Sequence, residues 1–150
     1  MKLIGFWPPY FFSGISVEKV NDDFTSITTK MKQYWFNTNY VGTHFGGSLY
    51  SMCDPFYMFI LLHHLGKDHI VWDKTSYIDF IKPGKRIVRS TFSVSLDEIE
   101  KLRKKALEEF SFNAEFQTDI RDESGEVVAK VKKLLYIRRK DAKKRIKKGP

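Results

Sequence analysis

The stretch Asn39-Tyr40-Val41-Gly42-Thr43-His44-Phe45-Gly46-Gly47, followed by Asp54, lies where a polar loop becomes a long apolar segment. It brings together an amide, a pair of glycines and a carboxylate. Glycines that open a helix leave backbone N–H groups bare at its positive end, which suits an oxyanion. A lone acid inside an apolar segment is costly unless it is paired or used in chemistry. The stretch therefore predicts a catalytic site.

The apolar segment itself, Ser48 to Leu65, has no polar face and is followed by Gly66, which is typical of a helix end. A helix of this kind must be buried. Alternating residues and turn signals around it predict six strands, at Gly14–Val20, Phe24–Tyr34, Ile70–Ile81, Arg86–Ser95, Phe112–Arg121 and Glu126–Arg138. An antiparallel sheet curled around one long central helix accounts for both patterns, so we expect an α+β fold.

A second helix is predicted over Leu96–Glu109, between two of these strands. Ser95 followed by Glu98 forms a plausible capping box at its start. Its apolar residues form one narrow stripe, made of Ile99, Leu102 and Ala106. This segment is therefore expected to be an inserted surface helix.

Composition narrows the class of protein. A chain of 150 residues with 42% hydrophobic content fits a single domain with a real core. The single Cys53 excludes an internal disulfide and a cysteine-based metal framework, and no metal site is expected. The first residues, broken by Pro8-Pro9, do not resemble a signal peptide. The longest apolar run, Phe56 to Leu62, is far below the roughly 20 residues of a membrane span. We expect a soluble, cytoplasmic protein without a membrane partner.

The net charge of +8 is concentrated at the C-terminus. Residues from Arg138 to Pro150 include eight basic side chains and one acid, so the rest of the chain is nearly neutral. The expected organisation is one domain over residues 1–138 and a basic tail over residues 139–150. Such tails are usually solvated, with contact to nucleic acid or a phosphorylated ligand as the alternative, and we do not expect nucleic acid as the partner.

The order of elements resembles the hotdog fold, and the opening stretch is similar to hotdog thioesterases of the phenylacetyl-CoA (PaaI-like) type. Their pattern is Asn, Gly three residues later, His-Gly-Gly beginning six later, and an acid fifteen later. Matching positions here are Asn39, Gly42, Gly46, Gly47 and Asp54, with Phe45 where that family usually has His. Further stretches resemble a poorly characterised branch, also found fused to acetyltransferase-like domains: Ile70-Val71-Trp72-Asp73-Lys74, Phe80-Ile81-Lys82-Pro83-Gly84 and Leu135-Tyr136-Ile137-Arg138-Arg139-Lys140.

This resemblance implies an acyl-CoA or acyl carrier protein thioesterase with coenzyme A as part of the substrate and no separate cofactor. It gives Gly46 the role of oxyanion donor, Asp54 that of base or nucleophile, and Asn39 that of positioning water or the carbonyl. On one helix, Asp54 is about two turns beyond Gly46, too far to share one carbonyl. In the resembling enzymes the site forms across a dimer interface, which implies a homodimer or a dimer of dimers.

Other residues are expected around the substrate. Gly47, Phe45 and His44 adjoin the oxyanion donor, and the resemblance places Asp73 or Thr75 beside the substrate. Candidates for contacting the phosphates of coenzyme A are Lys82, Lys85, Arg86 and the run Arg138–Lys140.

Several alternatives stay open at the level of sequence. Because Pro55 follows it, Asp54 is also a plausible N-cap of a helix that begins or kinks there. With Phe45 in place of histidine, His44 could be a displaced substitute or a loop histidine with local partners. Cys53 could be a nucleophile with His44 as base, although a lone cysteine in an apolar helix is usually a small buried hydrophobe. A non-catalytic acyl-CoA binder is the main alternative function, and a dehydratase is a third.

Overall fold

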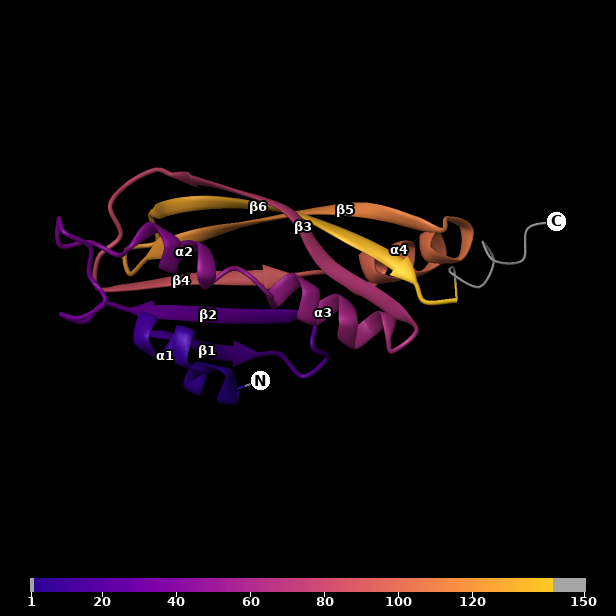
Figure 1. The fold of residues 1–150 in the computed structure, drawn as a ribbon, viewed down its shortest axis with the longest axis horizontal. Helices are drawn as coiled ribbons and strands as arrows, with labels where there is room; N and C mark the ends of the chain where they lie inside the picture. The colour runs from indigo at the N-terminus through magenta and orange to yellow at the C-terminus, as the bar shows by residue number, and fades with distance from the viewer. Residues whose placement is uncertain (1, 142–150) are drawn as a thin grey trace.

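Two helices in series lie across the inner face of a six-stranded antiparallel sheet (Figure 1). The computed structural model describes residues 2–141. The strands are β1 (Ile15–Val20), β2 (Ser26–Lys32), β3 (His69–Phe80), β4 (Ile87–Ser93), β5 (Ser111–Asp122) and β6 (Val127–Arg139). They are arranged in the order β1-β2-β4-β5-β6-β3, so β1 and β3 form the two edges. Each of the six predicted strands is present, and the α+β architecture is confirmed.

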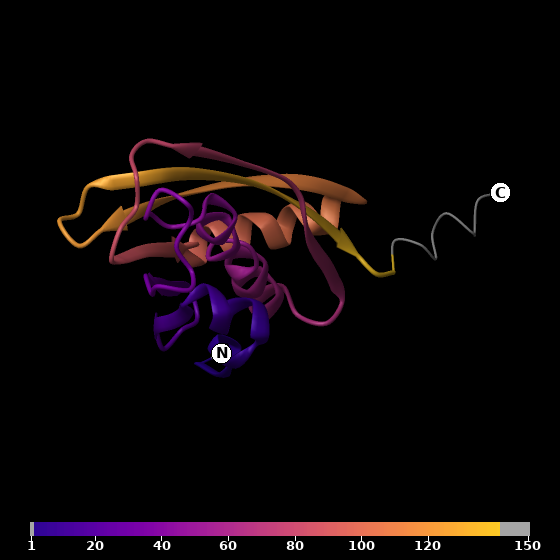
Figure 2. The same ribbon diagram turned by 60° about the vertical axis from the view of Figure 1, so that its left-hand side comes forward.

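The predicted central helix is interrupted. It consists of α2 (Gly46–Ser51) and α3 (Phe56–Leu65), with Met52–Pro55 between them. The N–H of Phe59 donates to the carbonyl of Pro55, which begins the second helix. A proline cannot donate a backbone hydrogen bond to a preceding turn, so the chain changes course at this point. The break at Asp54-Pro55 thus lies where the sequence allowed a kink, and residues 46–65 still cross the inner face as one unit (Figure 2).

Aromatic packing joins the helix to the sheet. The ring of Phe56 on α3 is stacked on Phe92 of β4 at 5.0 Å between centroids, and Tyr57 meets the same ring edge-on at 5.3 Å. Phe56 and Phe92 are fully buried. Such aromatic pairs stabilise a fold beyond the area that they bury. The core therefore lies between α3 and the curled sheet, as the apolar sequence of this helix predicts.

The remaining helices cover the ends of this core. The N-terminal segment forms a 3-10 helix (Lys2–Phe6) and α1 (Pro8–Ser13), and Tyr10 is buried against the junction of α2 and α3. The inserted helix α4 (Leu96–Glu108) begins at Ser95, whose side chain accepts a hydrogen bond from the N–H of Glu98. Arg103 of α4 donates to the carbonyl of His64, so α4 lies beside the C-terminal end of α3. Both predicted features of this region, the cap and the buried stripe, are confirmed.

Register determines which residues of β3 and β6 face the helices. Residues paired across an antiparallel sheet point to the same face, and successive residues alternate. Asp73 pairs with the buried Leu135, whereas Ser76 pairs with Lys133, because an extra residue forms a β-bulge between Asp73 and Thr75. The bulge lets the two halves of β3 both turn side chains toward the core.

No helix among residues 2–141 is long and apolar enough to cross a bilayer. The predicted basic tail lies outside the described residues from position 142 onward.

Candidate functional site at the helix junction

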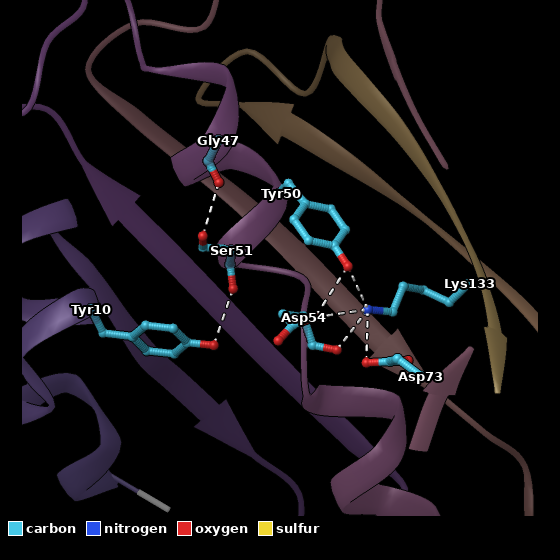
Figure 3. A network of polar contacts seen from close by, with 7 residues as sticks. All are labelled: Tyr10, Gly47, Tyr50, Ser51, Asp54, Asp73 and Lys133. Atoms are coloured by element: carbon cyan, nitrogen blue, oxygen red, sulfur yellow. Dashed lines mark hydrogen bonds and ion pairs between the residues drawn. The ribbon is translucent and has the colours of Figure 1, made fainter. Parts of the chain in front are cut away.

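Asp54 is located in the break between α2 and α3, with its side chain half exposed. Its Oδ1 accepts a hydrogen bond from the hydroxyl of Tyr50 at 3.2 Å and lies 3.2 Å from Nζ of Lys133 (Figure 3). Oδ2 has no hydrogen-bond partner within residues 2–141. One oxygen of the carboxylate is therefore held, and the other is free to meet a solvent molecule or a substrate.

The capping alternative for Asp54 is wrong in its main point. The N-cap residue of α3 is Pro55, and no side chain donates or accepts a capping bond there. The carboxylate of Asp54 instead contacts a tyrosine and a lysine side chain. The break between the helices is a feature of the backbone, and the carboxylate of Asp54, which caps no helix, remains available to contact a substrate.

Lys133 carries the positive charge of this site. Its side chain is completely buried on the inner face of β6, and its Nζ lies 3.0 Å from Oδ2 of Asp73. The same Nζ donates to the backbone carbonyl of Asp54 at 2.9 Å. Burial acts to lower the pKa of Lys133, but the hydrogen bond to Asp73 and the charges of Asp73 and Asp54 outweigh it, so the pKa is raised. Lys133 is thus an ammonium group between two carboxylates.

Asp73 is the second carboxylate, and the sequence prediction that it belongs near the site is consistent with this position. Burial raises its pKa, while the hydrogen bond and charge of Lys133 act in the opposite direction and the charge of Asp54 raises it further. Its Oδ1 is buried without a hydrogen-bond partner among the described residues. Asp73 is therefore linked to Asp54 through the shared lysine.

The glycine pair lies at the start of α2 and is bordered by two aromatic rings. A Cβ on Gly47 would lie 2.5 Å from Cε1 of Phe45, and one on Gly46 would lie 3.0 Å from Cζ of Phe80. Within residues 2–141, neither glycine N–H donates to a protein acceptor, because the first bonds of the turn come from Ser48 and Leu49. The two bare N–H groups that the sequence predicts are present, and Phe45 is an exposed neighbour.

Asn39 organises the loop before these glycines. Its Oδ1 accepts hydrogen bonds from the N–H groups of Val41 and Thr43, and its Nδ2 donates to Thr43 Oγ1 and to the carbonyl of His44. Both ends of the amide are therefore used within residues 39–44. The side chain holds the loop that leads into α2.

His44 is buried rather than turned toward the glycines. Its Nε2 lies 3.1 Å from the carbonyl oxygen of Arg86, and Nδ1 is buried without a partner among the described residues. Burial lowers its pKa, against a smaller opposite effect of the Arg86 hydrogen bond. This geometry fits the alternative in which His44 is a loop histidine with local hydrogen-bond partners, and not a displaced substitute for the histidine that resembling thioesterases usually carry at position 45.

The other predicted substrate contacts are dispersed. Thr75 lies on the outer face of the sheet and lines a groove of about 500 Å³ together with Tyr77 and Lys132. Lys82 forms ion pairs with Asp122, at 2.6 Å, and with Glu126, so its charge is already neutralised.

Arg86 is exposed and has a left-handed backbone, with φ of 56°. Its N–H and carbonyl bond to Gln33, and its guanidinium has no ion pair within residues 2–141. Unlike Lys82, Arg86 therefore has a charge that remains available for a phosphate.

Cys53 is fully buried next to Asp54. Burial raises the pKa of its thiol to about 12, although a hydrogen bond with Ser90 and the charge of Lys133 act in the opposite direction. A buried thiol of this kind is not a nucleophile at neutral pH. Among residues 2–141 no three His, Cys, Asp or Glu side chains are grouped to hold a metal ion.

Lys133 and Tyr50 were not predicted from the sequence as residues of this site. A signal for Lys133 was present, since it occupies the same alternating phase of β6 as the buried Val131, Leu135 and Ile137. A lysine in an apolar row needs a buried partner. No comparable signal marked Tyr50, whose contact with Asp54 depends on the end of α2.

The antiparallel sheet curled around an inner helix defines a hotdog fold. A Pseudomonas aeruginosa protein of unknown function, described as a "probable thioesterase", superposes with a TM-score of 0.76 at 21% identity, covering 87% of this chain and 86% of the other. A thioesterase from Haemophilus influenzae gives 0.67 at 12% identity, with 92% and 87% covered. The chain belongs to the family described as Domain of unknown function (DUF4442), whose model matches residues 1–137.

A third similar structure is a hypothetical thioesterase from Streptococcus pneumoniae TIGR4 with coenzyme A. It gives a TM-score of 0.60 at 19% identity, covering 91% of this chain and 97% of the other. At these identities the likeness concerns the fold. No curated protein matches the chain in sequence.

Proposed function

We propose that this protein is a thioesterase that hydrolyses an acyl-CoA, or the corresponding acyl carrier protein thioester, with Asp54 as its acidic residue. The single observation that carries the proposal is the carboxylate of Asp54, which is half exposed, held through Oδ1 and open at Oδ2. A carboxylate fixed in this way is suited to act on a thioester carbonyl directly or through a water molecule. The coenzyme A in a similar fold supports the class of substrate.

The proposed chemistry is a simple hydrolysis. Asp54 takes a proton from water as the water oxygen attacks the thioester carbonyl, or its carboxylate attacks first and water then releases the acyl group. The carbonyl oxygen becomes an oxyanion, which a bare N–H of Gly46 can stabilise. Collapse of this intermediate breaks the carbon–sulfur bond, and the coenzyme A thiolate leaves and is protonated.

We propose that two subunits share this site. Gly46 begins α2 and Asp54 lies in the junction beyond its last residue, so the length of the helix keeps them apart. A second copy of the chain would bring the Gly46 of one subunit to the Asp54 of the other, as a homodimer or a dimer of dimers. Asn39 contributes by holding the loop that presents Gly46, and the free guanidinium of Arg86 is the proposed contact for a phosphate of coenzyme A.

A thiol-release assay with short, long and aromatic acyl-CoAs tests this function, with Asp54→Asn as the matched variant. We expect thiol release by the native protein and at least a 100-fold lower kcat for Asp54→Asn, with an unchanged oligomer and unfolding midpoint. Equal rates for the two proteins would contradict the proposal.

A second function, acyl-CoA binding without hydrolysis, is favoured by the exposed ring of Phe45 at the start of α2. A phenyl ring cannot donate a hydrogen bond to the thioester, and the buried His44 does not replace it. Tight binding of an acyl-CoA by the native protein, with no thiol release, would support this function over the first.

A further inference from the structure

Lys133 is the one lysine of β6 whose side chain is completely buried, and it is drawn at the centre of the polar network in Figure 3. Burying an ammonium group is expensive unless charged partners and hydrogen bonds compensate for the lost water. Here the partners are Asp54 and Asp73, and the ring of Tyr50 lies 5.1 Å from Nζ. Because burying this charge is unfavourable, Lys133 is expected to have a role in addition to packing.

The contacts of Lys133 fix Asp54 in two ways. Nζ donates to the backbone carbonyl of Asp54 at 2.9 Å, which anchors the helix junction, and lies 3.2 Å from Oδ1, which sets the rotation of the carboxyl group. The hydroxyl of Tyr50 reinforces the same oxygen. Both contacts leave Oδ2 as the open oxygen, so they determine which atom of Asp54 faces the substrate.

Lys133 itself cannot reach a substrate, because its side chain has no exposed surface. It therefore acts through Asp54. Asp73, at 3.0 Å, is the counter-ion that anchors the ammonium from the opposite side. The ammonium group of Lys133 thus lies between the two carboxylates and contacts both.

The groups that face this network come from several elements. They are Tyr50 on α2, Cys53 and Asp54 in the junction, Asp73 on β3, Lys133 on β6 and, beyond the junction, Tyr10 on α1. Tyr10, whose hydroxyl donates to the carbonyl of Ser51, and the thiol of Cys53 both have raised pKa values because of burial, so they stay neutral near pH 7. The charge of the network is thus set by Lys133 and the two aspartates.

We propose that Lys133 is the positioning residue of the site: it orients the carboxylate of Asp54 through Oδ1 and anchors its backbone carbonyl, with Asp73 as the counter-ion. This inference deepens the proposed function, and its catalytic consequence rests on that function. It assigns Lys133 a role in orienting the carboxylate of Asp54 that a merely structural lysine would not have.

The test compares Lys133→Met with the double variant Lys133→Met/Asp73→Asn. The single variant removes the cation and leaves two acids, whereas the double variant removes the buried charge pair together and spares the fold. Lys130→Met, on the exposed side of the same strand, is the matched control. For each protein, the ¹³C signal of the Asp54 carboxyl is recorded by NMR at neutral pH, and kcat and KM for acyl-CoA hydrolysis are measured separately at the same pH.

In Lys133→Met we expect the ¹³C signal of the Asp54 carboxyl at neutral pH to move away from its native position, and kcat to fall at least tenfold with KM little changed, because the contact that orients Oδ1 is lost. The double variant should unfold at nearly the native temperature, yet its kcat at neutral pH should stay at least tenfold below that of the native protein, with KM little changed. Lys130→Met should match the native protein in every measurement.

An unchanged ¹³C signal of the Asp54 carboxyl in both Lys133 variants would overturn the inference, even if they are less stable. Full kcat in the double variant would overturn it as well. If the native protein releases no thiol from any substrate, the proposed hydrolysis fails, while the NMR signal of Asp54 in the variants still decides whether Lys133 orients its carboxylate.

Discussion

Phe45 folds back over Gly47, so that a Cβ on the glycine would lie only 2.5 Å from Cε1 of the phenyl ring. The ring is therefore held over the first turn of α2, where the N–H groups of Gly46 and Gly47 are bare. Because the side chain at position 45 is 59% exposed, a change of ring chemistry there alters the site without disturbing the core.

Phe45→His should raise the rate of thioester hydrolysis. An imidazole in place of the phenyl ring adds a hydrogen-bond donor beside the thioester, in the position where resembling thioesterases usually carry histidine. We expect kcat/KM to increase at least several-fold in the thiol-release assay, with little change in stability. Phe45→Leu, which adds no donor, is the control. If both variants hydrolyse at the native rate, a donor at position 45 has no part in the reaction.

The thiol of Cys53 should be inert in the folded protein. Because burial raises its pKa to about 12, almost no thiolate exists at pH 8, and reagents have no access. Ellman's reagent should give no reaction with the native protein and one equivalent after denaturation. Cys53→Ala should still release thiol from acyl-CoA. Rapid labelling of the native protein would contradict the buried position.

His44 should make the stability depend on pH below neutrality. Burial lowers its pKa in the fold, so the unfolded chain binds its proton first as the pH falls through about 6.5. Stability is then present above this pH and lost below it, at a slope approaching 1.4 kcal/mol per pH unit until the folded pKa is reached. Urea unfolding at pH 7.5 and 5.5 measures this change. His44→Gln keeps a donor toward Arg86 but does not titrate, and it should show a smaller difference. Equal differences in both proteins would exclude His44 as the cause.

Phe92→Ala should be the most destabilising of these changes. The ring is fully buried between Phe56 and Tyr57, and its removal leaves a cavity between α3 and the sheet. Large-to-small changes of this kind cost about 3–5 kcal/mol. The free energy of unfolding in urea gives the measurement, with Phe92→Leu expected to lose clearly less. A loss below 1 kcal/mol for Phe92→Ala would mean that the core collapses around the gap.

Much of the fold could be predicted from the sequence because its patterns are local. Alternation along each strand results from burial of one face, and it indicated the sheet. The apolar segment from Ser48 to Leu65 results from burial on all sides, and it indicated the central helix. The interruption of that helix was foreseeable at Pro55, but its geometry depends on contacts with Tyr10 and Lys133. Such contacts join residues far apart along the chain.

The candidate site was predictable only in part, for the same reason. The motif spacing indicated Gly46 and Asp54, whereas the partner of Asp54 comes from β6, seventy-nine positions later. The phase of Lys133 along β6 indicated burial, yet nothing in the sequence named its partners. Asp73 was expected beside the substrate on resemblance, but its position opposite Lys133 depends on the bulge in β3.

Because of the β-bulge, β3 contains one residue more than its pairing with β6 requires. Asp73 pairs with Leu135 and Thr75 with Leu134, which are already consecutive residues of β6, so Lys74 is the extra residue. Deleting Lys74 would therefore leave both halves of the strand in their present register, with Asp73 still facing inward. Inserting a residue on either side of Lys74 would instead exchange the inward-facing and outward-facing side chains in one half of the strand. A related chain that lacks one residue at this position would keep the same strand pairing. A sequence alignment that places this one-residue gap elsewhere in β3 would align the wrong residue with Asp73.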